Sequence, residues 1–550
     1  MRERLRVVAA VARDPGLARI ELAYFGFNMT EYATWIAILV YAYGLGGAAT
    51  AGLVAMVQLI PAGLVAPFAA FAGDRFRRDR VLLAGYLVQA AALGATAAAL
   101  SAGAPVFVTL FAATIAAMSF TITRPTQAAI LPSITHTPED LTAANAVSGL
   151  AENVGILVGP FLAGLLLGGW GTGAVFAAFA VVTIVSALLV IRLPLVAVAA
   201  PVEQLGARDV LRESFGGFAV LRRERPVLLL VLVLAAGIVV IGALDVLFVA
   251  VAIDLIHMGE AWAGFLYSAF GMGGILGAIG AVALVGRRRL TPSIAGGGLL
   301  FGMPLAAVSL VPFAATAPVL FAASGAGSSV ATVAGRTLLQ RIAPEAVLAR
   351  VFGVLEGLGM FALAAGSVGA AALIETLGIS AALVVTGLFV PVALALAWIP
   401  LRALDRDARA PDPEALAILR RLPIFAPLPA PAIERIMAAL VRLDVPAGHV
   451  LIREGDEGDR FYVIVEGSVA VSQGGRHLAD RVAGDHVGEI ALLRDVPRTA
   501  TVTAITPLRL LALDRGPFLE AVTGHPQSRA HAEAVAAGRL AGDMSQSGDD

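Results

Sequence analysis

Apolar stretches of about 20 residues follow one another from residue 19 to residue 400, and they constrain the fold more than any other feature. Each stretch can cross a hydrocarbon layer of about 30 Å as a helix, because a helix rises 1.5 Å per residue. Only 14% of the residues are charged, whereas soluble domains have about 25%. A single soluble enzyme is therefore excluded, and we expect an α-helical membrane protein.

The apolar stretches predict twelve spans in two groups of six. The predicted spans are 19–43, 50–72, 80–101, 105–131, 141–168 and 173–192, then 227–252, 261–285, 291–313, 317–340, 350–374 and 379–400. A long connection separates the groups, so a membrane domain (1–400) would consist of halves at about 19–192 and 227–400. This 6+6 arrangement is the plan of many secondary transporters.

Among the loops, arginine is confined to alternate ones, and this pattern predicts the orientation of the spans. Arginines gather at 75–80 and 402–409, whereas the breaks at 44–49 and 168–173 have none. Loops rich in arginine stay on the cytoplasmic side of a membrane. We therefore expect a multi-pass protein of the bacterial inner membrane whose N- and C-termini both face the cytoplasm.

The composition changes after Pro400. Residues 401–415 are charged and contain proline, as is typical of a linker. A second domain is expected at 416–540, followed by a polar tail at 541–550.

Short alternating strands, interrupted by glycines, are predicted over 441–513 of this second domain. Helices are expected on either side, at 416–440 and at about 515–541. The sequence therefore predicts a cytoplasmic β-roll or jelly-roll flanked by helices.

Several ionisable residues fall inside the predicted spans, where charge is costly and marks a transport pathway or a proton relay by default. The candidates for proton coupling are Glu31, Glu152 and Asp245. Each can also be a structural carboxylate that is paired with an arginine, as can Glu356. Two further acidic residues near the ends of spans, Glu21 and Asp254, are expected on a solvated face.

The loop between the second and third spans contains an aspartate followed by several arginines, Asp74, Arg75 and Arg78 among them. This pattern resembles the signature loop of the major facilitator superfamily, although two of its usual glycines are absent here. The resemblance implies that Asp74 pairs with cationic groups of neighbouring helices, including Arg124, and that these four residues gate the cytoplasmic side.

The fifth span carries glycines and a proline in the pattern Gly155-x3-Gly159-Pro160-x3-Gly164. Small residues at this spacing allow helices to approach closely. The pattern resembles the fifth-helix motif of exporters in the same superfamily, and the regions after Arg124 and Arg336 resemble its efflux-type branch. The resemblance implies a secondary active transporter, a proton-coupled exporter of a drug-like or siderophore-like small molecule.

The segment 488–502 combines a glycine, a carboxylate and a guanidinium. Glu489 can accept a hydrogen bond from a ribose hydroxyl, and the planar fork of Arg498 suits a phosphate group. No glycine-rich loop ending in lysine is present, so a nucleoside triphosphate is not the expected ligand. The residues predict a site for a nucleotide with a single phosphate group.

This segment resembles the phosphate-binding cassette of cyclic nucleotide-binding domains. The resemblance implies that Glu489 binds the ribose 2′-hydroxyl and Arg498 the cyclic phosphate. The ligand is then cAMP or cGMP: bacterial domains of this kind mostly use cAMP, whereas Thr499 is the residue type associated with cGMP. The predicted binding residues are Gly488, Glu489, Ile490, Ala491, Pro497, Arg498, Thr499 and Ala500.

The combined hypothesis is a transporter regulated by cyclic nucleotide, not an enzyme. Its expected partners are the lipid bilayer, a small-molecule substrate and a cyclic nucleotide, with no nucleic acid and neither metal nor cofactor. The chain has no cysteine, which excludes thiolate metal sites. The alternative is a degenerate transporter that serves as a membrane-anchored cyclic nucleotide receptor or scaffold.

Overall fold

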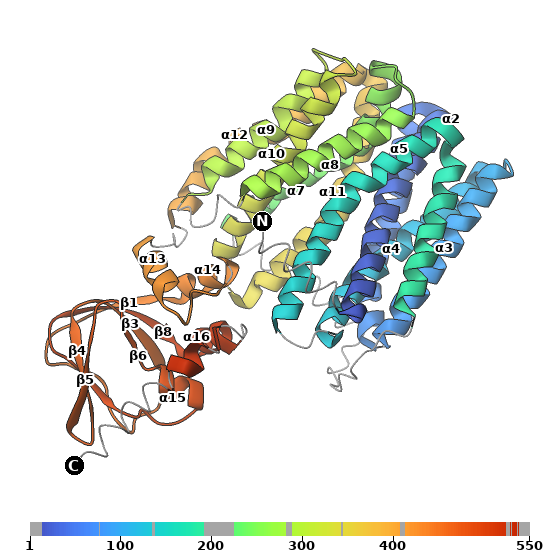
Figure 1. Ribbon diagram of the computed structural model, residues 1–550. Helices are drawn as coiled ribbons and strands as arrows, with labels where there is room; N and C mark the ends of the chain where they lie inside the picture. The colour runs from blue at the N-terminus through green and yellow to red at the C-terminus, as the bar shows by residue number, and fades with distance from the viewer. Residues whose placement is uncertain are drawn as a thin grey trace. The chain divides into compact units, whose positions relative to one another are not determined.

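The structure is a computed structural model of the 550-residue chain. It describes residues 14–75, 77–134, 138–191, 225–281, 289–342, 345–407, 413–428, 430–523, 528–529, 531–535 and 537. The chain divides into two compact units, a helical one that ends at Ala408 and a second one formed mainly by 409–550 (Figure 1).

Ten helices of the described chain are long and apolar enough to cross a membrane. The helices of this unit are α2 (Pro15–Arg75), α3 (Arg78–Ser101), α4 (Val106–Ile134), α5 (Pro138–Val190), α7 (Arg225–Ala250), α8 (Ala261–Ala281), α9 (Thr291–Val308), α10 (Thr316–Ile342), α11 (Glu345–Leu377) and α12 (Ile379–Asp407). A short π-helix, η1 (Val251–Leu255), continues α7. The predicted membrane class is confirmed, with ten such helices where twelve were expected.

Two of the predicted loops are kinks within long helices. In α2 the helical path breaks at Gly46 and Gly47, and in α5 it breaks at Gly171. Gly47 and Gly171 have φ values of 65° and 77°, a left-handed conformation that glycine adopts without steric cost. Each kink therefore joins two helical segments with almost no intervening loop.

Glycines bring the helices of the two predicted halves into contact. Gly52 of α2 lies against Ser367 of α11, and Gly264 of α8 lies against Pro160 of α5. The motif in α5 also faces α2, since a Cβ at Gly159 would be 2.5 Å from the carbonyl oxygen of Met29. The glycines of the fifth-span pattern thus allow α5 to pack closely against α2 on one side and α8 on the other.

Replacing Gly264 by alanine is expected to destabilise the helical unit. The new Cβ would overlap the carbonyl oxygen of Pro160, which is backbone and cannot move aside, and overpacking of this kind costs about 1–3 kcal/mol. Gly280 lies on the same helix with no atom within 4 Å of its would-be Cβ, so Gly280→Ala is the matched control. Thermal unfolding of the full-length protein should show a lower midpoint for Gly264→Ala alone, and equal midpoints would contradict this packing.

The second unit contains two antiparallel four-stranded sheets with strand orders β1-β8-β3-β6 and β2-β7-β4-β5. The strands are β1 (Val441–Val445), β2 (Val450–Ile452), β3 (Arg460–Glu466), β4 (Ser468–Gln473), β5 (Arg476–Val482), β6 (His486–Val487), β7 (Thr501–Ala504) and β8 (Leu508–Asp514). The helices are α13 (Pro413–Arg421), α14 (Ala430–Ala439), α15 (Glu489–Arg494) and α16 (Arg515–Thr523). The predicted β-roll with flanking helices is confirmed.

The helical boundaries around the second unit differ from the prediction in three places. Of the helix expected at about 515–541, α16 covers Arg515–Thr523. The single helix expected at 416–440 is two helices, because Pro423 and Pro427 fall in the segment between them and proline interrupts a helix. The expected linker at 401–415 is partly helical, since α12 continues through Pro400 to Asp407. The predicted connection after Ile191 and the tail at 541–550 lie outside the described residues.

An aromatic cluster fixes the helices of the second unit to its sheet. Phe461 of β3 stacks on Phe518 of α16, with ring centroids 4.7 Å apart. Phe425, from the segment between α13 and α14, packs edge-on against both rings. This aromatic core supports β3 and the segment just before β3. That segment contacts the pocket described below.

Candidate functional site

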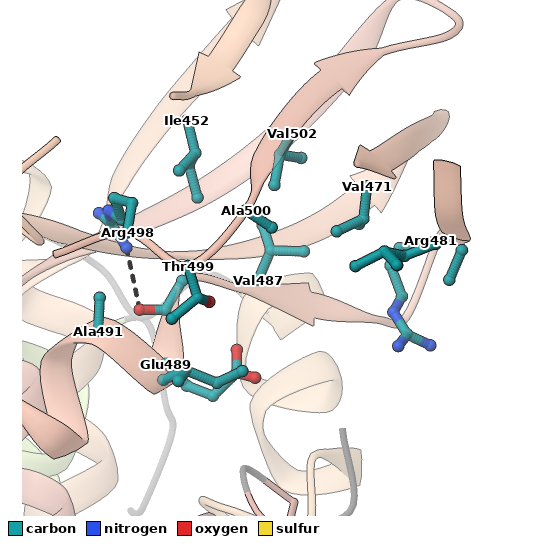
Figure 2. Close-up of a pocket in the computed structure, with 14 residues that line it drawn as sticks. Ile452, Val471, Arg481, Val487, Glu489, Ala491, Arg498, Thr499, Ala500 and Val502 are labelled. Atoms are coloured by element: carbon teal, nitrogen blue, oxygen red, sulfur yellow. Dashed lines mark hydrogen bonds between the residues drawn. The ribbon is translucent and has the colours of Figure 1, made fainter. Parts of the chain in front are cut away.

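A pocket opens between the two sheets and α15 in the second unit (Figure 2). Its lining residues are Ile452, Val471, Leu478, Ala479, Arg481, Val487, Gly488, Glu489, Ile490, Ala491, Arg498, Thr499, Ala500 and Val502. Seven of the eight predicted binding residues are therefore brought together. Pro497 is not among the lining residues and lies exposed beside them.

The turn before α15 requires a glycine. Gly488 has a φ of 95°, and a Cβ there would lie 2.8 Å from the carbonyl oxygen of Arg460. Glu489 follows directly and is 1% exposed. Figure 2 shows its carboxylate below Thr499 in the pocket.

Arg498 is the buried cation of the pocket, only 4% exposed. Its guanidinium donates to the carbonyl oxygens of Gly488 at 3.0 Å and Arg460 at 2.7 Å, and to Asp459 Oδ1 at 2.9 Å. Its own backbone N–H donates to the carbonyl oxygen of Asp456 at 2.8 Å. These contacts fix the position of a guanidinium that a phosphate group would share with Asp459.

Tyr462 of β3 is 6% exposed and close enough to Arg498 to interact with it electrostatically. Burial raises the pKa of its phenol, and the nearby carboxylate of Asp459 acts in the same direction. The Tyr462 hydroxyl is therefore neutral at physiological pH, and Arg498 supplies the positive charge of this region of the site.

Sequence reasoning missed Arg481, which enters the pocket from β5. In Figure 2 it lies on the opposite side of the pocket from Arg498. Its position follows from the pairing of β5 with β4, in which Val469 faces Arg481 and Val471 faces Ala479. Alternate residues of a strand share a face, so this period of two was the available signal.

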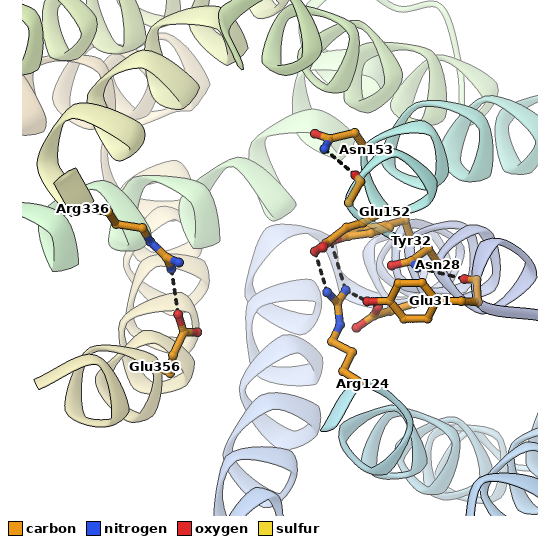
Figure 3. Close-up of polar contacts among 10 residues, drawn as sticks. Asn28, Glu31, Tyr32, Arg124, Glu152, Asn153, Arg336 and Glu356 are labelled. Atoms are coloured by element: carbon orange, nitrogen blue, oxygen red, sulfur yellow. Dashed lines mark hydrogen bonds and ion pairs between the residues drawn. The ribbon is translucent and has the colours of Figure 1, made fainter. Parts of the chain in front are cut away.

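In the helical unit, three helices bring charged side chains together at Arg124 of α4 (Figure 3). The guanidinium lies 2.7 Å from Glu31 Oε2 of α2 and 2.5 Å from Glu152 Oε1 of α5. Its Nη2 also lies 3.4 Å from the hydroxyl of Tyr32. We call Glu31, Arg124 and Glu152 the charged triad. Sequence analysis named all three residues without predicting that they meet.

Arg124 was expected to pair with Asp74, whereas its described partners are Glu31 and Glu152. Those two carboxylates lie on the neighbouring helices α2 and α5, within reach of the guanidinium. The side chains of Asp74 and Arg75 lie outside the described set, so their gating role stays a prediction. Arg78 donates to the carbonyl oxygen of Ala129 at 2.8 Å and thereby links α3 to α4.

The second half of the helical unit has a comparable but simpler pair. Arg336 of α10 lies 2.7 Å from Glu356 of α11. Asp245 of α7 is 4% exposed and accepts a hydrogen bond from Trp35 of α2. Trp35 thus links Asp245 to the first half.

One expectation for the acidic residues near the span ends was wrong. Glu21 is not on a solvated face but is 4% exposed, because its side of α2 packs against the neighbouring helices, and Ser148 of α5 donates a hydrogen bond to it at 2.7 Å. Asp254 is exposed as expected, and its Oδ2 accepts a hydrogen bond from Tyr43 at 2.5 Å.

Comparison with known proteins gives two family matches. Residues 20–321, more than half of the chain, match the model of the Major Facilitator Superfamily. Residues 442–525 match the model of the cyclic nucleotide-binding domain. The second match covers the strands and the pocket described above.

The curated relatives each match a short part of the chain. The chain is 47% identical over 88 residues to the cAMP-dependent protein kinase regulatory subunit of Dictyostelium discoideum, covering 14% of this chain and 27% of that one. It is 41% identical over 96 residues to a cyclic nucleotide-gated potassium channel of Rhizobium etli, covering 18% and 27%. The chain thus spans about a quarter of the length of these relatives.

Among solved structures, the regulatory domain of Toxoplasma gondii PKA in complex with cAMP is 25% identical. The match covers 25% of this chain and 55% of that one, with a TM-score of 0.22. By the family match over most of the helical unit, the chain belongs to the Major Facilitator Superfamily, and it carries a cyclic nucleotide-binding domain at its C-terminal end.

Proposed function

We propose that the protein is a secondary active transporter whose activity is regulated by a cyclic nucleotide. A single observation carries this proposal: one chain joins a Major Facilitator Superfamily domain to a pocket that contains both Glu489 and Arg498. A carboxylate for the ribose and a buried guanidinium for the phosphate are the two polar groups that a cyclic nucleotide needs.

The transport direction and coupling complete the proposal. The protein exports a drug-like or siderophore-like small molecule across the bacterial inner membrane in exchange for protons, with both termini in the cytoplasm. We count twelve crossings, because the kinked helices α2 and α5 each comprise two helical segments. Glu31, Glu152 and Asp245 are the candidates for proton coupling, and a basic loop with Asp74, Arg75 and Arg78 gates the cytoplasmic side.

The choice between cAMP and cGMP falls on two lining residues, Thr499 and Arg481. Thr499 offers a hydroxyl, and Arg481 offers several N–H donors, which suit the O6 and N7 acceptors of guanine. The described residues after Phe518 include no tryptophan, tyrosine or phenylalanine that could cover the base. Arg481 is the residue whose stacking or hydrogen bonding would compensate.

Flux measurements test this function. Full-length protein in liposomes that contain a pH-sensitive dye is supplied with a panel of drug-like and siderophore-like compounds, with and without saturating nucleotide at the cytoplasmic face. We expect the nucleotide to change the initial rate about 5–150-fold, the usual range for coupled sites. Arg498→Ala should remove the difference between the two rates.

Two outcomes would change the assignment. Equal flux with and without nucleotide would refute regulation. Nucleotide binding without flux for any compound would favour the membrane-anchored receptor or scaffold.

A further inference from the structure

Among the described residues of the helical unit, buried side-chain atoms without a hydrogen-bond partner occur in the first half. These atoms belong to Glu21, Asn28, Gln58, Tyr86, Gln89, Thr109, Thr123 and Gln127. In the second half, every buried side-chain polar atom of the described residues 225–407 has a partner. The two halves use similar helix packing, so unpartnered groups are not a general consequence of this architecture.

Glu21 is the charged member of this group. Ser148 donates to its Oε1 at 2.7 Å, and its Oε2 has no hydrogen-bond partner. The nearby arginines have other partners: Arg19 donates to the carbonyl oxygens of Leu189 and Ile191, and Arg124 belongs to the charged triad. Among the described residues, therefore, no cation neutralises this buried carboxylate.

Neutral polar side chains of α3 and α4 lie in the same half of the unit and offer hydroxyl and amide groups. The Tyr86 hydroxyl of α3 is fully buried and close enough to Glu21 and Tyr24 to interact electrostatically. Gln89 lies almost one turn further along α3, and on α4 Thr123 and Gln127 are 1% and 2% exposed. The helices are in contact here, since a Cβ at Gly85 would lie 3.8 Å from Thr123 Oγ1.

We propose that this region, which we call the Glu21 site, binds a small monovalent cation, either a sodium ion or a proton that is carried by the Glu21 carboxyl group. Oxygen atoms are the ligands that hard cations prefer, and a buried carboxylate without a counter-charge is strongly disfavoured. A single positive charge balances Glu21, whereas a divalent ion would leave a net charge inside the bundle. An organic cation does not fit, because the site side chains are at most 4% exposed.

The Glu21 site is separate from the charged triad, where Arg124 already neutralises one carboxylate. On α2 it lies ten residues before Glu31, or about 15 Å along the helix axis at 1.5 Å per residue. This step rests on the transport proposed above. The Glu21 site lies near the end of α2 that is expected to face the cytoplasm. From there it supplies a coupling ion to the first half of the helical unit.

The test uses full-length protein in lipid nanodiscs without any transported substrate. In the sodium arm, thermal unfolding is followed by tryptophan fluorescence while NaCl replaces choline chloride at constant ionic strength. In the proton arm, infrared spectroscopy in sodium-free buffer records the carbonyl band of protonated carboxylic acids. We expect a saturable sodium-dependent rise of the midpoint, or an acid band, that Glu21→Gln removes.

Two further variants keep the test interpretable. Tyr86→Phe removes only a hydroxyl, so it should still fold and weaken sodium binding about 3–10-fold, the effect of one hydrogen bond, or shift the acid band. Glu260→Gln changes an exposed carboxylate in a loop and should respond as the wild type does. If Glu21→Gln and Tyr86→Phe match the wild type in both arms, the site does not exist. Since no flux is measured, this result is independent of the transport proposal.

Discussion

An Arg498→Ala variant is expected to bind cyclic nucleotide at least about 30-fold more weakly than the wild type. Truncating one partner of a buried, charge-assisted pair costs about 2–5 kcal/mol, and each 1.4 kcal/mol is a tenfold change in affinity. Arg498 is 4% exposed and hydrogen-bonded on several sides, so the fold holds its guanidinium in one position. Calorimetric titration of the full-length protein in detergent with cAMP and cGMP measures the loss.

Asp459→Asn is the matched control on the same ion pair. The Asp459 side chain is 70% exposed, and an exposed ionic contact is worth about 0–1 kcal/mol. We therefore expect its nucleotide affinity to change less than about fivefold. Affinity that is unchanged in Arg498→Ala, with the fold retained, would mean that the phosphate is bound elsewhere.

Arg481→Leu separates recognition of the base from recognition of the phosphate. Arg481 is distant from Arg498 in the pocket (Figure 2), so the variant should retain binding. If its donors reach the base, the ratio of cGMP to cAMP affinity should fall by about tenfold, the effect of one good contact. An unchanged ratio would leave Thr499 as the remaining candidate for base selection.

The cassette was predictable from sequence because its residues are close together in the chain. Glu489 and Arg498 are nine positions apart, and a single turn, α15 and the segment after it place both in one pocket. Arg481 was not predictable in the same way, since its place depends on how β5 pairs with β4. Local motifs predict local sites, whereas contributions from other strands depend on the register of the sheet.

The helical unit shows the same limit over longer distances. Hydropathy identified Glu31 and Glu152 as buried carboxylates, but their meeting at Arg124 depends on the packing of three helices that are far apart in sequence. Glu21 was assigned to the solvated face from its depth alone, and depth does not reveal which side of a helix faces its neighbours. The kinks at Gly46–Gly47 and Gly171 were predicted as loops, because breaks in hydropathy mark both equally.

Replacing Arg124 by glutamine is expected to abolish transport and to destabilise the protein. The change leaves Glu31 and Glu152 close together without the guanidinium that neutralises them. Breaking a fully buried ion pair costs about 3–5 kcal/mol. Arg124, Glu31 and Glu152 are 34%, 25% and 38% exposed, so we expect about 1–3 kcal/mol here after solvent screening.

The second half of the helical unit provides the control. Arg336 and Glu356 form a pair of the same residue types at the same distance of 2.7 Å, but they are 45% and 67% exposed and involve one carboxylate instead of two. Arg336→Gln should therefore change the free energy of unfolding by less than about 1 kcal/mol. Thermal unfolding of the two full-length variants, side by side, measures the difference.

A double variant distinguishes the structural role of Arg124 from its role in transport. Arg124→Gln combined with Glu152→Gln leaves only Glu31 charged, so the repulsion disappears and the unfolding midpoint should recover most of its loss. If the charged triad couples protons as proposed, flux should stay absent, because Glu31 then lacks both the guanidinium and the second carboxylate. Recovery of flux together with stability would show that the triad holds the helices together and takes no part in coupling.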